Sequence, residues 1–148
     1  MSRKQSREVA FKLLFGLAFD GGGETDLDLA VAGDKVLLKS DDDEKPHDQP
    51  TIDAKEMQYI NNLCAIVKNN LEKIDEIISA TAKGFSFDRI YKVDLTALRL
   101  AVGEIMFVPE TPDIVAVNEA VNLVKKYGTA ASAGYVNGIL ASVLENRK

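Results

Sequence analysis

The stretch DAKEMQYINNLCAIVKNNLEKIDEIISATAKG, residues 53–84, carries the strongest structural signal in the chain. Its apolar residues recur at alternating steps of three and four, which is the spacing of one face of an α-helix. These residues are Met57, Ile60, Cys64, Val67, Leu71, Ile74 and Ile78. Asp53 followed by Glu56 resembles a capping box with aspartate in the cap position. The stretch therefore predicts an amphipathic helix with a defined beginning.

This helix is expected to cover about residues 54–82, with Asn69 and Asn70 as candidates for a bend and Gly84 as its end. A coiled-coil stripe is the alternative. About three heptads inside a globular sequence favour a core helix of a bundle.

The flanking sequence shows the same helical spacing and no run of alternating apolar and polar residues long enough for a strand. Further helices are expected at residues 2–19, 93–107 and 113–127, and from about Ser132 onward. Ser2 is the expected N-cap of the helix over residues 2–19. Gly128 is the expected left-handed residue just after the helix over residues 113–127. The prediction is an all-α fold.

Length and composition indicate one globular domain, residues 1–148, with an acidic, irregular segment at about 20–53. The apolar share of 46% is too high for a disordered chain. No 18-residue apolar run and no signal peptide are present, so we expect no membrane span and a cytoplasmic location. The one cysteine fits a reducing compartment.

The net charge of −5 argues against nucleic-acid binding, but the charges are unevenly distributed. Residues 20–53 carry eleven acids against three lysines, whereas residues 1–12 carry four basic side chains against one acid. Exposed charges more than about 8–10 Å apart are largely screened from one another at physiological salt. A basic surface at the start of the chain is therefore compatible with the acidic total.

Catalytic and metal-binding patterns are absent from the sequence. There is no phosphate-binding glycine loop, no ligand cluster around His47 and no nucleophile elbow. Asp75 and Glu76 are adjacent on a predicted helix, where neighbours do not face each other, so a solvated face is expected there. We expect no enzyme, no cofactor and no metal.

Two features indicate RNA binding. Arg3, Lys4 and Arg7 open the first helix, where cations oppose the helix dipole and phosphates would be attracted. A solubilising tail is an equally good interpretation of these charges. Tyr135, which follows the small residues Ser132 and Gly134, could stack on an unpaired base. Core packing is the common alternative for such a ring.

Several segments resemble the NusB family of transcription antitermination factors. They are SRKQSREVA (residues 2–10), the segment 83–105, DIVAVNEAV (113–121), KKYG (125–128) and YVNGIL (135–140). They occur in the family's order and cover about half of the chain.

The resemblance implies a bundle of about six to seven helices in two packed sub-bundles. It implies binding of boxA-type single-stranded RNA together with NusE, a small-subunit ribosomal protein. It further implies support of RNA polymerase on ribosomal RNA operons, and a monomer or homodimer.

By position, the resemblance assigns RNA contacts to two groups of residues. The first group is Arg3, Lys4 and Arg7, and the second is Ser132, Gly134 and Tyr135. It gives a mainly structural role to Asn118, Glu119, Asn137 and Gly138. The family often has Asp at the position of Ala131 and Lys at the position of Gly134, so a phosphate contact is lost here.

A helical protein–protein interaction module without direct RNA binding is the alternative function, supported by the acidic segment and by Gly134. An accessory domain of an RNA methyltransferase would share the fold, but 148 residues leave no room for a cofactor-binding domain.

Overall fold

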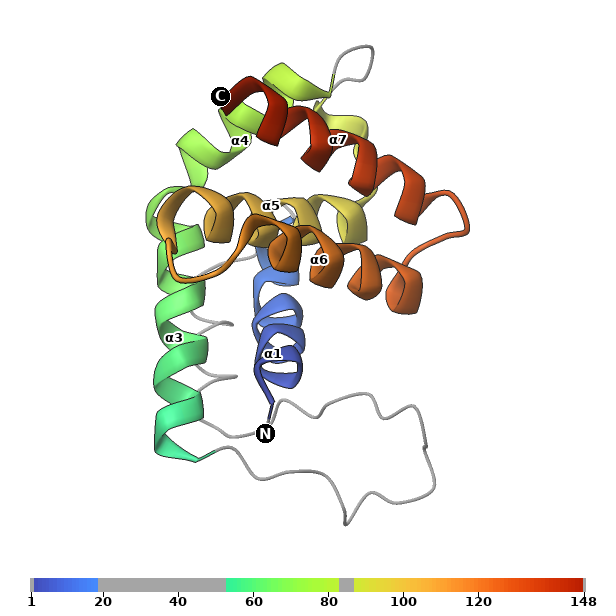
Figure 1. Cartoon of the computed structure of the whole chain (residues 1–148). Helices are drawn as coiled ribbons and strands as arrows, with labels where there is room; N and C mark the ends of the chain where they lie inside the picture. Colours follow the sequence, from blue (N-terminus) through green and yellow to red (C-terminus); the bar gives the residue numbers. More distant parts are fainter. Residues whose placement is uncertain (1, 19–52, 83–86, 148) are drawn as a thin grey trace. The chain divides into compact units, whose positions relative to one another are not determined.

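The computed structural model describes residues 2–18, 53–82 and 87–147, and every regular element in these ranges is helical (Figure 1). The helices are α1 (Arg3–Phe15), η1 (Gly16–Ala18), α3 (Ala54–Asn69), α4 (Leu71–Thr81), η3 (Phe87–Arg89), α5 (Lys92–Phe107), α6 (Asp113–Tyr127) and α7 (Ser132–Arg147). The all-α prediction is confirmed. Residues 19–52, which hold most of the acidic segment and His47, and the predicted helix end at Gly84 lie outside the described residues. Within the described ranges, no helix combines the length and apolar character needed to cross a membrane.

The chain divides into two compact units, Met1–Cys64 and Ala65–Lys148, with the boundary inside α3. In the first unit, α1 begins with the predicted cap. The Ser2 hydroxyl accepts from the Gln5 backbone N–H at 3.1 Å, and the Gln5 side chain accepts from the Ser2 N–H at 2.9 Å. This reciprocal pair satisfies two backbone donors that a helix start otherwise leaves open. At the start of α3, the Asp53 carboxylate accepts from the Glu56 N–H at 2.8 Å, which is one half of the predicted capping box.

Cys64 packs in the core of the first unit. It is 3% exposed, and its thiol lies 4.0 Å from the backbone oxygen of Ala10. Burial raises the pKa of the Cys64 thiol to about 12. Because only a thiolate is an effective nucleophile, this cysteine is a packing residue.

The predicted long helix over residues 54–82 is interrupted at Asn70, at the site where a bend was a candidate. The Asn70 backbone leaves the helical region, with φ −117° and ψ 19°, and its side chain donates to the Ile66 oxygen at 2.8 Å. A side-chain amide that takes up a helix carbonyl competes with helix continuation. The apolar spacing nevertheless persists into α4, where Ile74 and Ile78 are fully buried.

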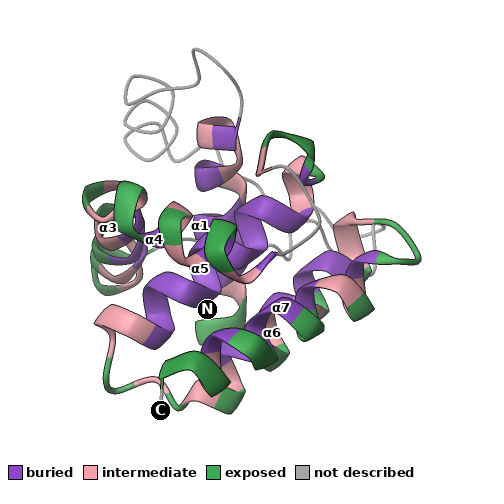
Figure 2. Cartoon of the chain, turned by 90° about the horizontal axis from the view of Figure 1, so that it is seen from above, coloured by how far each residue is buried: buried purple, intermediate pink, exposed green. Residues whose placement is uncertain are grey.

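The second unit is built around α5. Helices α4, α6 and α7 each contact it, and α6 and α7 also pack on one another (Figure 1). Every residue of α5 from Asp94 to Ile105 is buried, as the purple ribbon in Figure 2 shows. The sequence predicted one buried face on this helix. Instead α5 is covered on several sides, so Asp94, Arg99 and Glu104 are buried as well.

Arg99 of α5 forms a two-armed ion pair with Asp75 of α4. Its Nε and Nη2 donate to the two carboxylate oxygens, both at 2.9 Å. The side chains are only 7% and 24% exposed, respectively. The expectation that Asp75 belongs to a solvated face was therefore wrong, because α5 supplies a cation that the local sequence does not contain. Glu76 is exposed, as expected.

Candidate nucleic-acid interface

The start of α1 presents two of the three predicted basic residues to solvent. Arg3 and Lys4 are exposed, and the Arg3 guanidinium lies 3.8 Å from the ring centroid of Tyr59 on α3. A cation over an aromatic face is stabilised by about 0.5–1 kcal/mol at an exposed site. The stack holds a charged, exposed group in a fixed place, which lowers the ordering cost of binding a phosphate.

Arg7 differs from its two neighbours. It is only 7% exposed, and the adjacent Glu8 is equally buried. Arg7 follows Arg3 by one helical turn, so the predicted common face exists, but at Arg7 that face is buried. The sequence did not identify Tyr59, because its position beside the apolar seam of α3 looks like ordinary packing.

The turn between α6 and α7 is held together by Ser132. The Thr129 N–H donates to the Ser132 hydroxyl at 2.9 Å, and the two hydroxyl oxygens lie 3.2 Å apart. Ser132 is 1% exposed. A direct RNA contact was expected of it, but its hydroxyl is used inside the protein, where it fixes the start of α7.

Tyr135 lies on the next turn of α7 and is partly exposed. Its hydroxyl oxygen is buried, so the exposed surface belongs mainly to the rest of the residue. Burial raises the pKa of Tyr135, and the negative charge of Asp94 raises it further. The Tyr135 hydroxyl is therefore protonated and neutral at physiological pH.

Asp94 is a member of this site that the sequence did not reveal. It is 5% exposed on α5, burial raises its pKa, and a hydrogen bond from Ser132 opposes part of that rise. Acidic residues in the first turn of a helix are common because they complement the dipole. From the sequence, Asp94 therefore resembled a surface residue.

The remaining signature residues lie mostly at the surface. Gly134, Asn118, Asn137 and Gly138 are exposed, and Glu119 is partly exposed. Among the residues that the structure describes, the Asn118 side chain makes no hydrogen bond, so the structural role expected of it finds no support in its contacts.

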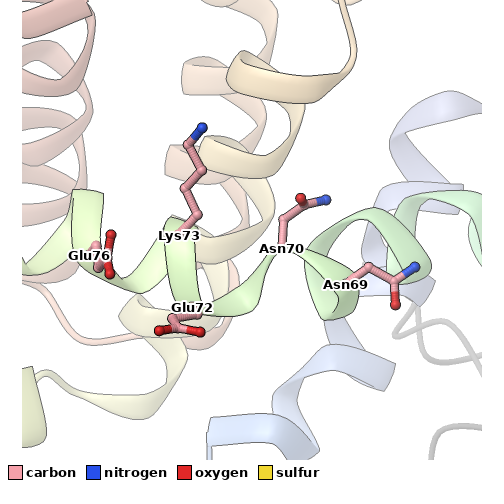
Figure 3. A pocket seen from close by; sticks show the side chains of 5 residues that line it. All are labelled: Asn69, Asn70, Glu72, Lys73 and Glu76. Carbon is pink, nitrogen blue, oxygen red and sulfur yellow. The ribbon is translucent and has the colours of Figure 1, made fainter.

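A polar hollow lies at the junction of α3 and α4, lined by Asn69, Asn70, Glu72, Lys73 and Glu76 (Figure 3). Across the described ranges, no group of three or more histidine, cysteine or acidic residues could hold a metal ion.

Gly128 allows the close approach of α6 to Ser132. Its backbone is extended, with φ −98°, so the predicted left-handed conformation is wrong. The physical reason for glycine is space, since a Cβ there would lie 2.6 Å from the Ser132 hydroxyl and 2.7 Å from the Val124 oxygen.

Gly128→Ala is accordingly expected to reduce the free energy of unfolding by about 1–3 kcal/mol, because a backbone oxygen must move. Urea denaturation measures this change. Gly138→Ala is the matched control. A Cβ there meets no atom within 4 Å, and alanine should stabilise α7 by about 0.5–1 kcal/mol. Equal effects at the two glycines would contradict the steric explanation.

Comparison with known proteins gives one consistent family. The model of the NusB family matches residues 4–145. The transcription antitermination protein NusB of Natranaerobius thermophilus is 36% identical over 143 residues, covering 97% of this chain and 94% of the relative. NusB of Clostridium botulinum strain Hall is 36% identical over 146 residues, covering 97% of this chain and all of the relative.

Comparison with solved structures indicates the same family. NusB of T. maritima superposes with a TM-score of 0.79 at 30% identity, covering 98% of this chain and 92% of the other. NusB in a crystal structure of the antitermination factors NusB and NusE with double-stranded RNA gives a TM-score of 0.75 at 26% identity, with coverages of 97% and 96%. The fold, the ordered signature segments and the near-complete coverage of these relatives lead to one conclusion: the chain belongs to the NusB family.

Proposed function

We propose that this protein is a cytoplasmic, non-catalytic antitermination factor that binds boxA-type single-stranded RNA together with NusE. In this role it supports RNA polymerase on ribosomal RNA operons. The observation that carries the proposal is that Tyr135 is a partly exposed residue near the start of α7, one turn after the hydrogen-bonded turn of Thr129 and Ser132. The solved complex of the relatives NusB and NusE with double-stranded RNA supports the choice of NusE and of RNA as partner classes.

In the proposed mechanism, charge and stacking have separate roles. Arg3 and Lys4 of the first unit contact phosphates and position the RNA without reading its sequence. Tyr135 of the second unit stacks on an unpaired base, as aromatic side chains do in single-strand recognition. Arg7 and Ser132 act from the interior, because both are buried.

Binding of a boxA-like RNA at several salt concentrations, with and without NusE, tests the proposal. Affinity should fall with salt and rise with NusE. Arg3→Ala should flatten the slope of log K against log salt by about 0.7, the contribution of one phosphate contact to a single strand.

Lys73→Ala removes an exposed lysine of the polar hollow on α4 and should leave the slope unchanged. If Arg3→Ala and the unmodified protein show the same slope of log K against log salt, Arg3 does not contact a phosphate of the RNA.

A protein-interaction module without direct RNA binding is the second candidate. Its support in the structure is Ile114 on α6, an apolar side chain that is 68% exposed. NusE binding that boxA-like RNA does not strengthen, together with no affinity for the RNA alone, would favour this second function.

A further inference from the structure

We propose that Arg3 and Tyr59 form a base-stacking site on the first unit. An unpaired base of single-stranded RNA lies on one face of the Arg3 guanidinium, and the Tyr59 ring supports the opposite face. The inference rests on the proposed function for its ligand class, which is single-stranded RNA. It goes beyond that function because it adds a base contact to Arg3, whose charge alone has been used so far.

The first argument is the geometry of the pair. The central carbon of the Arg3 guanidinium lies 3.8 Å from the centroid of the Tyr59 ring. Carbon atoms in van der Waals contact are about 3.5–4.0 Å apart, so the guanidinium lies directly against the face of the ring. A guanidinium is planar and stacks on aromatic faces, whereas the ammonium group of lysine is a point charge. Tyr59 therefore covers one face of Arg3 and leaves the opposite face turned away from the ring.

The second argument is that Arg3 has unused binding capacity. Arg3 is exposed, and within the described ranges its side chain has no hydrogen-bond or ion-pair partner. The N–H donors at the edge of a guanidinium suit a phosphate, while its face suits the flat surface of an unpaired base. One arginine can therefore bind a phosphate and a base of the same RNA strand.

The third argument is that the pair is held in place before RNA binds. The capping box of Ser2 and Gln5, with hydrogen bonds of 3.1 and 2.9 Å, fixes the turn of α1 that carries Arg3. Tyr59 is half-buried and directly precedes Ile60, which is fully buried. A stacking surface that is ordered in advance loses less conformational freedom when a base binds, which favours association.

Arg3→Lys tests the face of the guanidinium separately from its charge. Lysine keeps the positive charge, so the slope of log K against log salt should stay unchanged. Lysine has no planar face, so affinity for a boxA-like RNA in the presence of NusE should fall about 3- to 30-fold, the range of a cation–π stack that becomes shielded from water. Fluorescence anisotropy with a labelled RNA measures both quantities.

RNAs that carry a single abasic nucleotide show whether a base is the partner of Arg3. Removing a base keeps its phosphate, so only the contact of that base is lost. At one position, the abasic change should weaken binding to the unmodified protein but alter binding to Arg3→Lys by less than about twofold, because the stack is already missing. Lys4→Ala is the matched control, since it removes a neighbouring exposed charge and should leave every abasic effect unchanged. Abasic effects that are the same in Arg3→Lys and the unmodified protein at every position would overturn the inference.

Two variants of Tyr59 test its support of the guanidinium. Tyr59→Leu removes the ring and should weaken RNA binding about 2- to 5-fold, whereas Tyr59→Phe keeps the ring and should stay within about twofold of the unmodified protein. In the Arg3→Ala background, Tyr59→Leu should have no effect on affinity. A loss that persists in this background would assign the ring to packing and overturn the inference. The Arg3→Lys experiment changes nothing on α3, so it does not depend on the stability of Tyr59→Leu.

An oligouridylate of the same length separates this inference from the proposed function. Stacking accepts every base, so Arg3→Lys should also weaken binding of this RNA. If boxA-like RNA binds no more tightly than oligouridylate, boxA recognition fails, while the Arg3→Lys loss still supports the stacking site. If boxA-like RNA is preferred and Arg3→Lys binds both RNAs as tightly as the unmodified protein, the proposed function stands and the stacking site is overturned. Absence of binding to both RNAs overturns both.

Discussion

Tyr135→Ala is expected to weaken binding of boxA-like RNA by about 5- to 150-fold, because a base stacked on an aromatic ring contributes about 1–3 kcal/mol. Tyr135 is suited to this contact because the residue is partly exposed, its hydroxyl is neutral, and it follows the hydrogen-bonded start of α7. Fluorescence anisotropy with a labelled RNA, in the presence of NusE, measures the change. The slope of affinity against salt should stay constant, since stacking neutralises no phosphate.

Tyr135→Phe is the matched control. It keeps the ring and removes only the hydroxyl, whose oxygen is buried. We expect its RNA affinity to stay within about threefold of the unmodified protein, because the stacking surface is retained. Thermal melts should show that both proteins are fully folded. If Tyr135→Ala then binds RNA as tightly as the unmodified protein, Tyr135 does not stack on a base.

Arg99→Ala is expected to lower the free energy of unfolding by about 2–4 kcal/mol. The change leaves Asp75 without the cation that binds both of its oxygens at 2.9 Å. Removing one partner of a fully buried pair costs about 3–5 kcal/mol, and the 24% exposure of Asp75 reduces this loss because water can reach the carboxylate. Urea denaturation followed by circular dichroism measures the loss.

Two further variants test whether the ion pair is the cause. Arg89→Ala removes an exposed arginine of η3 and should change stability by less than about 0.5 kcal/mol. The double change Arg99→Met with Asp75→Leu should recover much of the loss, since an apolar pair of similar size leaves no uncompensated charge. A double variant that is less stable than Arg99→Ala would point to the lost packing of Arg99.

The helices of this protein were largely predictable because their signals are local. The apolar spacing from Met57 to Ile78, the caps at Ser2 and Asp53 and the bounds Asp113–Tyr127 all agree with the structure. Each depends on residues within about four positions, where helical geometry dictates which side chains meet. The sequence predicted only a bend at Asn70, whereas the helix is interrupted there. Whether the helix bends or breaks depends on how strongly the Asn70 side-chain amide competes with the backbone for the Ile66 carbonyl.

The candidate site was predicted in part. The sequence located Arg3, Lys4 and Tyr135, which are wholly or partly exposed, but it also assigned RNA contacts to Arg7 and Ser132, which are buried. Helical spacing correctly aligned Arg7 with Arg3. Spacing alone cannot show how far along a helix the surface extends before neighbouring elements cover it.

The sequence by itself determined that the chain is helical, where most described helices begin and end, and to which family it belongs. Only the tertiary structure decided which polar residues became internal anchors. Asp75 is paired by Arg99, which lies 24 positions away in the chain, and Asp94 is buried on α5. The energy of a buried charge is set by the partners and the solvent around it, and those surroundings exist only after distant helices have packed together.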